Sequence, residues 1–139
     1  MRPVYETEGD RSRESAVARK IETAFRCSMS KLQPRDRFDY ACIRGDDIVA
    51  FAEIKVRKNP MHQYDTYMVS MTKIVHANMI HSAVRLPCIL FVQWLDALGY
   101  IPMNRCDVSL RMGGRSDRND PLDIEPVCHI DISRFRIVR

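Results

Sequence analysis

Apolar side chains recur at helical spacing near the start of the chain. Asp10 or Ser12 can cap a helix just before them, because a short polar side chain there accepts hydrogen bonds from the first free backbone N–H groups. The pattern predicts a helix from about Ser12 to Cys27 with one apolar stripe, formed by residues spaced four apart: Val17, Ile21 and Phe25.

Alternating and continuous apolar runs after this helix indicate a β-hairpin. Its first strand is predicted at Phe38–Ile43, its second at Ile48–Val56, and its turn as the three-residue loop Gly45-Asp46-Asp47. The second strand is apolar on both faces. We therefore expect a central strand that is covered on each side.

A second strand and helix pair follows a polar loop. Tyr67–Val69 reads as a short strand, and Ser70 is a good cap for a helix that runs to about Val84. The apolar run from Leu86 to Trp94 predicts a buried strand, parallel to an earlier one through a right-handed crossover. The expected order is α-β-β-(short β)-α-β, which is an α/β fold with a central mixed sheet flanked by helices.

The last third of the chain is less regular. Strands are expected around Asp107–Met112, Val127–Ile132 and Phe135–Val138, with an exposed polar loop over residues 113–121. Arg115 and Arg118 in that loop could contact a phosphate backbone, although a solvated loop is the favoured interpretation. We expect one domain over residues 1–139, with a core at about 12–95 and a C-terminal β extension at about 96–139.

Composition narrows the function classes. The 139 residues carry 22 Lys and Arg against 18 Asp and Glu, a net charge of +4, and 45% are hydrophobic, as in ordinary globular chains. The longest apolar run is far too short for a membrane span, and the charged N-terminus is unlike a signal peptide. Five scattered cysteines favour reduced thiols, and zinc-ligand spacing and nucleotide-binding glycine loops are absent from the sequence.

Charged residues in the predicted central strand are the most informative feature. Glu53 and Lys55 occupy one face of that strand, and a three-residue hairpin loop sets Asp39 directly opposite Glu53. A buried ion pair is the structural alternative, but two carboxylates and one lysine leave a negative charge uncompensated. A divalent cation with hard oxygen ligands, Mg²⁺ or Mn²⁺, resolves this imbalance.

Two further charged residues head the apolar stripes of the predicted helices. Glu14 begins the stripe of the first helix, where a structural role beside the helix dipole is also reasonable. Lys73 begins the stripe of the second helix, and the alternative there is a lysine whose stem covers the core while its ammonium reaches water.

Asp39 and the triplet Glu53-Ile54-Lys55 together resemble the signature of the PD-(D/E)xK nuclease superfamily, an acid at the end of one strand followed by acid-x-lysine on the next. The resemblance covers roughly residues 12–95 and includes Glu14 and the helix start Ser70-x-x-Lys73. The proline of the signature departs from the pattern, since Pro34 lies upstream of the acid, and Asp36 is a competing candidate for the acid itself.

The resemblance implies a restriction-endonuclease-like fold and roles for the charged residues. Asp39, Glu53, the Ile54 carbonyl and Glu14 would bind Mg²⁺ or Mn²⁺, which would contact the scissile phosphate and activate a water. Lys55 would orient or deprotonate that water, or neutralise the pentavalent phosphate, and Lys73 would contact a phosphate.

The expected function is therefore metal-dependent hydrolysis of phosphodiester bonds, most plausibly in DNA. The alternative is a catalytically inactive nuclease-fold module for DNA binding or assembly. A homodimer is expected if both strands of a duplex are cut, and the expected location is the cytoplasm of a bacterium or a phage-infected host cell. The choice of DNA or RNA, and of end or internal cutting, is not encoded in these motifs.

Overall fold

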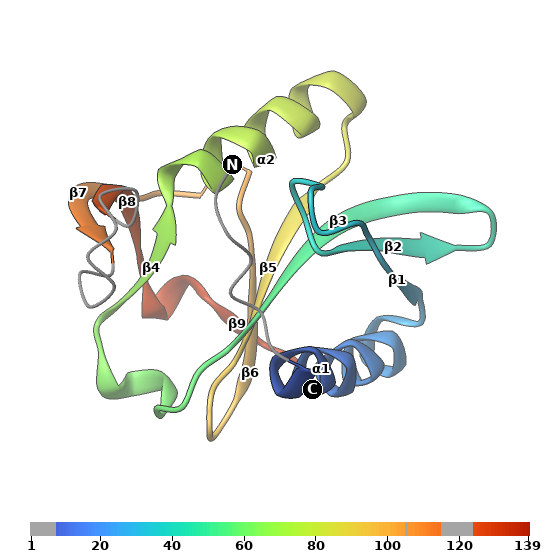
Figure 1. The fold of residues 1–139 in the computed structure, drawn as a ribbon, viewed down its shortest axis with the longest axis horizontal. Helices are drawn as coiled ribbons and strands as arrows, with labels where there is room; N and C mark the ends of the chain where they lie inside the picture. The colour runs from blue at the N-terminus through green and yellow to red at the C-terminus, as the bar shows by residue number, and fades with distance from the viewer. Residues whose placement is uncertain (1–7, 105, 115–123) are drawn as a thin grey trace.

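Six strands form the central sheet of the protein (Figure 1). The computed structural model describes residues 8–104, 106–114 and 124–139. The strand order is β1-β2-β3-β5-β6-β9, and β3 and β5 are parallel while the other neighbours are antiparallel. The strands are β1 (Ser28–Lys31), β2 (Tyr40–Arg44), β3 (Asp47–Val56), β5 (Cys88–Gln93), β6 (Leu98–Pro102) and β9 (Arg136–Ile137).

A smaller antiparallel sheet and two long helices complete the fold. The second sheet has the order β4-β8-β7, with β4 at Thr66–Ser70, β7 at Ser109–Gly114 and β8 at Ile124–Asp131. The helices are α1 (Glu8–Phe25) and α2 (Met71–Val84), and short 3₁₀ turns lie at Met61–Gln63 and Ile132–Arg134. No helix within the described ranges is long and apolar enough to cross a membrane.

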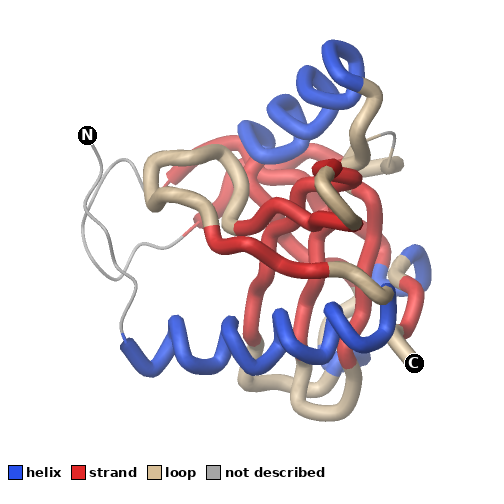
Figure 2. Tube along the Cα trace, turned by 90° about the vertical axis from the view of Figure 1, so that its right-hand side faces the viewer, coloured by secondary structure: helices blue, strands red, loops and turns tan. Residues whose placement is uncertain are grey.

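The two helices lie on opposite sides of the strands (Figure 2). Helix α1 packs its stripe of Val17, Ala18 and Ile21 onto one face of the central sheet, where Ala52 and Ile54 of β3 are fully buried. Small residues on β3 let the helix approach closely, and the apolar spacing of α1 provides the matching surface. The predicted central strand with two covered faces is confirmed.

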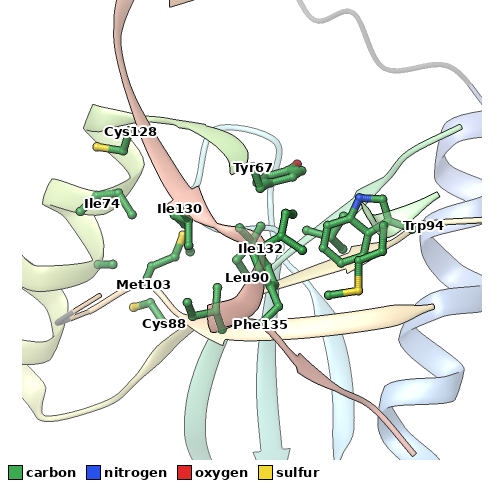
Figure 3. Packing of buried hydrophobic residues seen from close by; sticks show 14 of the residues in the cluster. Tyr67, Ile74, Cys88, Leu90, Trp94, Met103, Cys128, Ile130, Ile132 and Phe135 are labelled. Carbon is green, nitrogen blue, oxygen red and sulfur yellow. The ribbon is translucent and has the colours of Figure 1, made fainter. Parts of the chain in front are cut away.

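The other face of the central sheet is covered by α2 and the second sheet. Leu90 and Val92 of β5 meet Ile74 and Ala77 of α2 and Ile130 of β8 in one buried cluster (Figure 3). Glu53 and Lys55 project toward this side, because side chains alternate along β3. Glu53 and Lys55 therefore lie between the central sheet and the layer formed by α2 and the second sheet.

The hairpin turn differs from the predicted three-residue loop. Arg44 pairs with Asp47, so the loop contains only Gly45 and Asp46, and Gly45 adopts φ 61° as two-residue turns require. A β-bulge between Cys42 and Ile43 then shifts the register by one residue. Beyond the bulge, the register is the one that the longer loop would give.

Other element boundaries also needed correction. Helix α1 begins at Glu8, about one turn before the predicted start, so Ser12 lies inside the helix. It ends at Phe25, two residues before the predicted end at Cys27. Strands β1 and β6 were not predicted, because both are short and β1 alternates only once between polar and buried positions. The short strand β4 belongs to the second sheet, while β6 and β9 of the last third complete the central one.

The predicted second helix and parallel strand are confirmed. The Ser70 hydroxyl accepts a hydrogen bond from the Thr72 N–H at 3.2 Å, as an N-cap does. Strand β5 pairs in parallel with β3, with Glu53 opposite Leu90. Most of the predicted polar loop, including Arg115 and Arg118, lies outside the described residues.

Candidate functional site

Glu53 is a buried carboxylate on the central strand β3. Only 4% of its surface is exposed, and its neighbour on β5 is the fully buried Leu90. Because β3 is apolar on both faces, it is a central strand of the sheet, and Glu53 is buried as part of that strand. Burial of a carboxylate in such a place requires specific polar partners.

Asp39 lies at the start of β2, beside Glu53. Its backbone carbonyl accepts a hydrogen bond from the Leu32 N–H at 2.8 Å, and its side-chain Oδ2 accepts one from the Ile54 N–H at 3.3 Å. Asp39 is thus held between the chain leaving β1 and strand β3. The predicted juxtaposition of Asp39 with Glu53 follows from the register beyond the bulge, in which Tyr40 pairs with Ala52.

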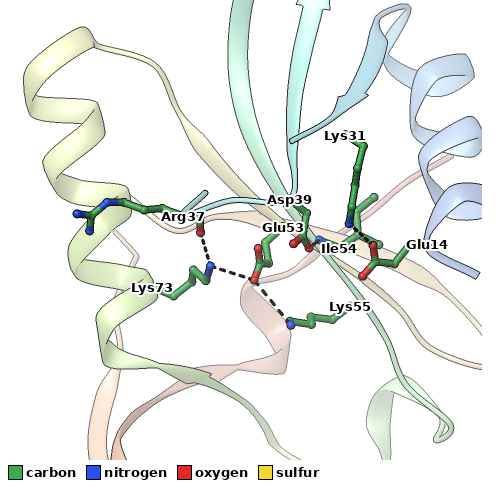
Figure 4. Close-up of polar contacts among 8 residues, drawn as sticks. All are labelled: Glu14, Lys31, Arg37, Asp39, Glu53, Ile54, Lys55 and Lys73. Carbon is green, nitrogen blue, oxygen red and sulfur yellow. Dashed lines mark hydrogen bonds and ion pairs between the residues drawn. The ribbon is translucent and has the colours of Figure 1, made fainter. Parts of the chain in front are cut away.

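Two lysines converge on one oxygen of Glu53 (Figure 4). Lys73 Nζ lies 3.3 Å from Glu53 Oε2, and Lys55 Nζ lies 3.7 Å from the same atom. Lys73 also donates to the backbone carbonyl of Arg37 and lies over the Phe38 ring, 5.1 Å from its centre. Lys73 is therefore fixed by three contacts, whereas the side chain of Lys55 is 45% exposed and faces open solvent on one side.

The charge balance differs from the one inferred from sequence. That inference counted two carboxylates and one lysine, but Lys73 of α2 joins Asp39, Glu53 and Lys55, so the group holds two charges of each sign. The net charge of this group therefore gives no reason to expect a cation. The surroundings of the individual carboxylate oxygens are more informative than the number of charged groups.

The environment of Glu53 favours its protonated form. Burial raises the pKa of Glu53 and nearby Asp39 raises it further, while the charges of Lys55 and Lys73 oppose this shift. Burial by itself lowers the pKa of Lys55, but the attraction of Glu53 and Asp39 outweighs burial and raises it, so Lys55 stays cationic at neutral pH. The carboxyl group of Glu53 is therefore costly to ionise, whereas the neighbouring ammonium group of Lys55 retains its proton.

One oxygen of Glu53 identifies a place for a cation. Oε1 is buried and has no hydrogen-bond partner, whereas both lysines contact Oε2. A buried carboxylate oxygen without a partner is unfavourable, and a hard cation is the type of ligand that compensates it. With Asp39 beside it, Glu53 supplies a donor set of carboxylate oxygens that fits Mg²⁺ or Mn²⁺.

Glu14 is engaged elsewhere. Its Oε2 accepts from Lys31 Nζ at 2.8 Å, and Lys31 also lies over the Tyr40 ring, 5.0 Å from its centre. Across residues 8–104, 106–114 and 124–139, no three His, Cys, Asp or Glu side chains form a group that could hold a metal ion. Asp39, Glu53, Lys55 and Lys73 are thus brought together, while Glu14 lies in a neighbouring ion pair.

Two residues at the edges of this group were not predicted. The pairing of Lys31 with Glu14 depends on β1, whose single buried apolar residue, Met29, was the available sequence signal. Tyr67 of β4 lies near the charged group, and burial raises the pKa of its hydroxyl. Its place in a strand of the second sheet could not be read from local sequence.

Comparison with known proteins bears on the family and the fold of the chain. A family model described as "Phage putative PDDEXK endonuclease" matches residues 1–138, which confirms the resemblance inferred from the motifs. No curated protein sequence matches the chain.

The fold is similar to that of a solved structure, Hjc, a Holliday junction resolvase from the archaeal hyperthermophile Archaeoglobus fulgidus. The match covers 88% of each chain with a TM-score of 0.55 and 12% sequence identity. At that identity the similarity concerns the fold, and it confirms the predicted restriction-endonuclease-like α/β class.

Proposed function

Because this chain belongs to the family of phage PDDEXK endonucleases, we propose that it cleaves phosphodiester bonds of DNA with a bound Mg²⁺ or Mn²⁺ ion. The observation that carries the proposal is the buried, unpartnered Oε1 of Glu53, which lies beside Asp39 and within reach of two lysines. In structural ion pairs, the large majority of buried side-chain oxygens have a hydrogen-bond partner.

Asp39, Glu53 and the Ile54 carbonyl would hold the ion, and Glu14 would support them from α1 through water. When bound, the ion supplies a Lewis acid for the scissile phosphate and lowers the pKa of water. Lys55 is cationic and partly exposed, so it can orient the attacking water and neutralise charge that develops on the phosphate. Lys73, held by Arg37 and Phe38, positions the Glu53 carboxylate and presents a cation near the start of α2.

The decisive experiment measures cleavage by the wild type and by Glu53→Ala and Lys55→Ala variants. The substrates are supercoiled, linear, single-stranded and branched DNA, together with an RNA, each with Mg²⁺, Mn²⁺ or EDTA. We expect cleavage by the wild type only with metal, and losses of about 10²- to 10⁴-fold in both variants. Lys58→Ala removes a neighbouring exposed lysine and serves as the matched control, with full activity expected.

Circular dichroism separates a chemical effect from unfolding. Full activity in both folded variants would refute the assigned roles. DNA binding without any cleavage by the wild type would instead favour a nuclease-fold binding module. In such a module, the two lysines near Glu53 would only balance the two carboxylates and would need no metal ion.

The partner and setting follow from the same proposal. Cutting both strands of a duplex takes two active sites or two successive visits, so we propose that two copies act together on duplex or branched DNA.

The structural neighbour acts on Holliday junctions, which makes a four-way junction the first branched substrate to test. Membership of a phage family is consistent with action in the cytoplasm of an infected cell. Light scattering with and without a junction measures the copy number directly.

A further inference from the structure

A cavity of about 430 Å³ is lined in part by Tyr67, the aromatic residue near the charged group. Its inner wall is apolar and largely aromatic, formed by Met61, Tyr67, Trp94 and Ile132, all of which are buried. Tyr67 and Trp94 meet edge to face with ring centres 6.0 Å apart, within the core cluster that also contains Ile132 (Figure 3). The volume is within the range of sites that enclose small planar ligands.

Polar side chains also line this cavity. Arg57 lies over the Tyr67 ring, with the guanidinium carbon 5.2 Å from its centre. Thr66 Oγ1 and His129 Nδ1, which also belong to the lining, are hydrogen-bonded at 2.8 Å. Tyr64 also lines the cavity, and because 61% of its surface is exposed, its ring is open to a ligand.

The cavity adjoins the proposed cleavage site through strand β3. Glu53, Lys55 and Arg57 occupy alternate positions and face the same side, and the Arg57 N–H donates to the Gln93 carbonyl at 2.8 Å, which continues the pairing with β5. The Tyr67 hydroxyl is influenced electrostatically by both Lys55 and Arg57. Two residues of a strand span about 6.6 Å, so a phosphate backbone held at Lys55 also reaches Arg57 in the cavity lining.

These features match the chemistry of a nucleobase attached to its phosphate. A base has two apolar faces that stack on aromatic rings, and an edge of donors and acceptors that hydroxyl and imidazole groups can meet. The guanidinium of Arg57 can bind the adjoining phosphate or stack on the base. A base inside a continuous duplex must first be unpaired and flipped out of the stack, which costs free energy that an unpaired base does not require.

We propose that this cavity binds one unpaired nucleotide of the nucleic-acid substrate next to the bond that is cut. This inference rests on the proposed function for the identity of the substrate. It gives the protein a preference for strands that are single, branched or locally opened. Tyr64 confers this preference by stacking on the base, and Arg57 adds affinity by contact with the phosphate.

The test measures binding rather than cleavage. Fluorescence anisotropy compares a short oligothymidylate with an abasic backbone of equal length and charge, in EDTA and in Ca²⁺. We expect the wild type to bind the oligothymidylate about tenfold more tightly. Tyr64→Ala should abolish most of this difference and leave affinity for the abasic strand unchanged, and Arg57→Ala should weaken binding of both strands.

Matched controls exclude general effects. Lys58→Ala removes an adjacent exposed cation, and Met79→Ala removes an exposed apolar side chain of α2, so both should retain the wild-type preference. Equal binding of the two strands by the wild type, no binding of either, or an unchanged preference in Tyr64→Ala would each overturn the inference.

The outcomes also separate this inference from the proposed function. Base-dependent binding without metal-dependent cleavage would leave the nucleotide cavity in place and remove the nuclease reaction. Metal-dependent cleavage without base-dependent binding would do the reverse.

Discussion

At the residue scale, the two oxygens of Glu53 have different surroundings. Oε2 receives both Lys55 and Lys73, while Oε1 has no partner and is buried. Within one carboxylate, the charge on Oε2 is balanced by two lysines, while Oε1 has no group to balance it. The sequence alone indicated a charged group on a central strand, but not this division, because the position of Lys73 depends on how α2 packs.

Glu53→Gln tests the cost of this buried charge in metal-free protein. Because the pKa of Glu53 is raised on folding, the native state binds more protons than the unfolded state, and ionisation of Glu53 lowers stability as pH rises through the shifted pKa. We expect the unfolding free energy of the variant to increase relative to wild type from acidic to neutral pH. Urea unfolding in EDTA across that range measures it, and a constant difference would contradict the assignment.

Lys73→Met tests whether Lys73 acts through Glu53. Removal of a cation 3.3 Å from the carboxylate should raise the pKa of Glu53 further. Carbon-13 NMR of labelled glutamate carboxyls in metal-free protein follows the titration directly. Lys73→Arg, which retains the charge, should return the midpoint toward that of wild type, and an unshifted midpoint in Lys73→Met would show that the lysine has only a packing role.

At the element scale, the hairpin of β2 and β3 sets the distance between the acids. Its existence, its central second strand and the opposition of Asp39 and Glu53 were predicted from alternation and turn residues. The loop length was not, because a bulge has no distinct sequence signature in an apolar strand and its extra residue, Val49, resembles its neighbours.

Gly45→Ala tests the turn itself. Gly45 has φ 61°, and a Cβ atom there would meet nothing within 4 Å, so the cost comes only from the backbone conformation. We expect a loss of about 1–2 kcal/mol in unfolding free energy, measured by urea denaturation. Gly45→Asn should recover much of the loss, because asparagine tolerates this conformation; equal destabilisation by both substitutions would point to another cause.

At the scale of the whole molecule, the site joins parts distant in sequence: β2 and β3 of the hairpin, α2 and, at its edge, β4. Local patterns predicted α2 and β5, but the second sheet depends on pairing of β4 with β8, nearly sixty residues further on. Long-range pairing of this kind leaves little trace in local periodicity. The position of Tyr67, and hence the cavity that it lines, was therefore outside the reach of sequence patterns.

Divalent metal should stabilise the whole fold if Asp39 and Glu53 bind it. A ligand at a hundred times its dissociation constant adds about 2.7 kcal/mol to the unfolding free energy. We expect Mg²⁺ to raise the midpoint of thermal unfolding by several degrees in wild type, and EDTA to reverse the effect. Glu53→Gln should abolish the rise, and a rise that persists in this variant would locate the ion elsewhere.

The bulge beside Cys42 also bears on how such proteins change over evolutionary time. A two-residue loop with a bulge and a three-residue loop without one place Asp39 opposite Glu53 equally well. An insertion at the tip can thus be offset by a deletion in the strand. Descendants of this chain are free to vary the length of the hairpin tip while inheriting an unchanged spacing of the acids.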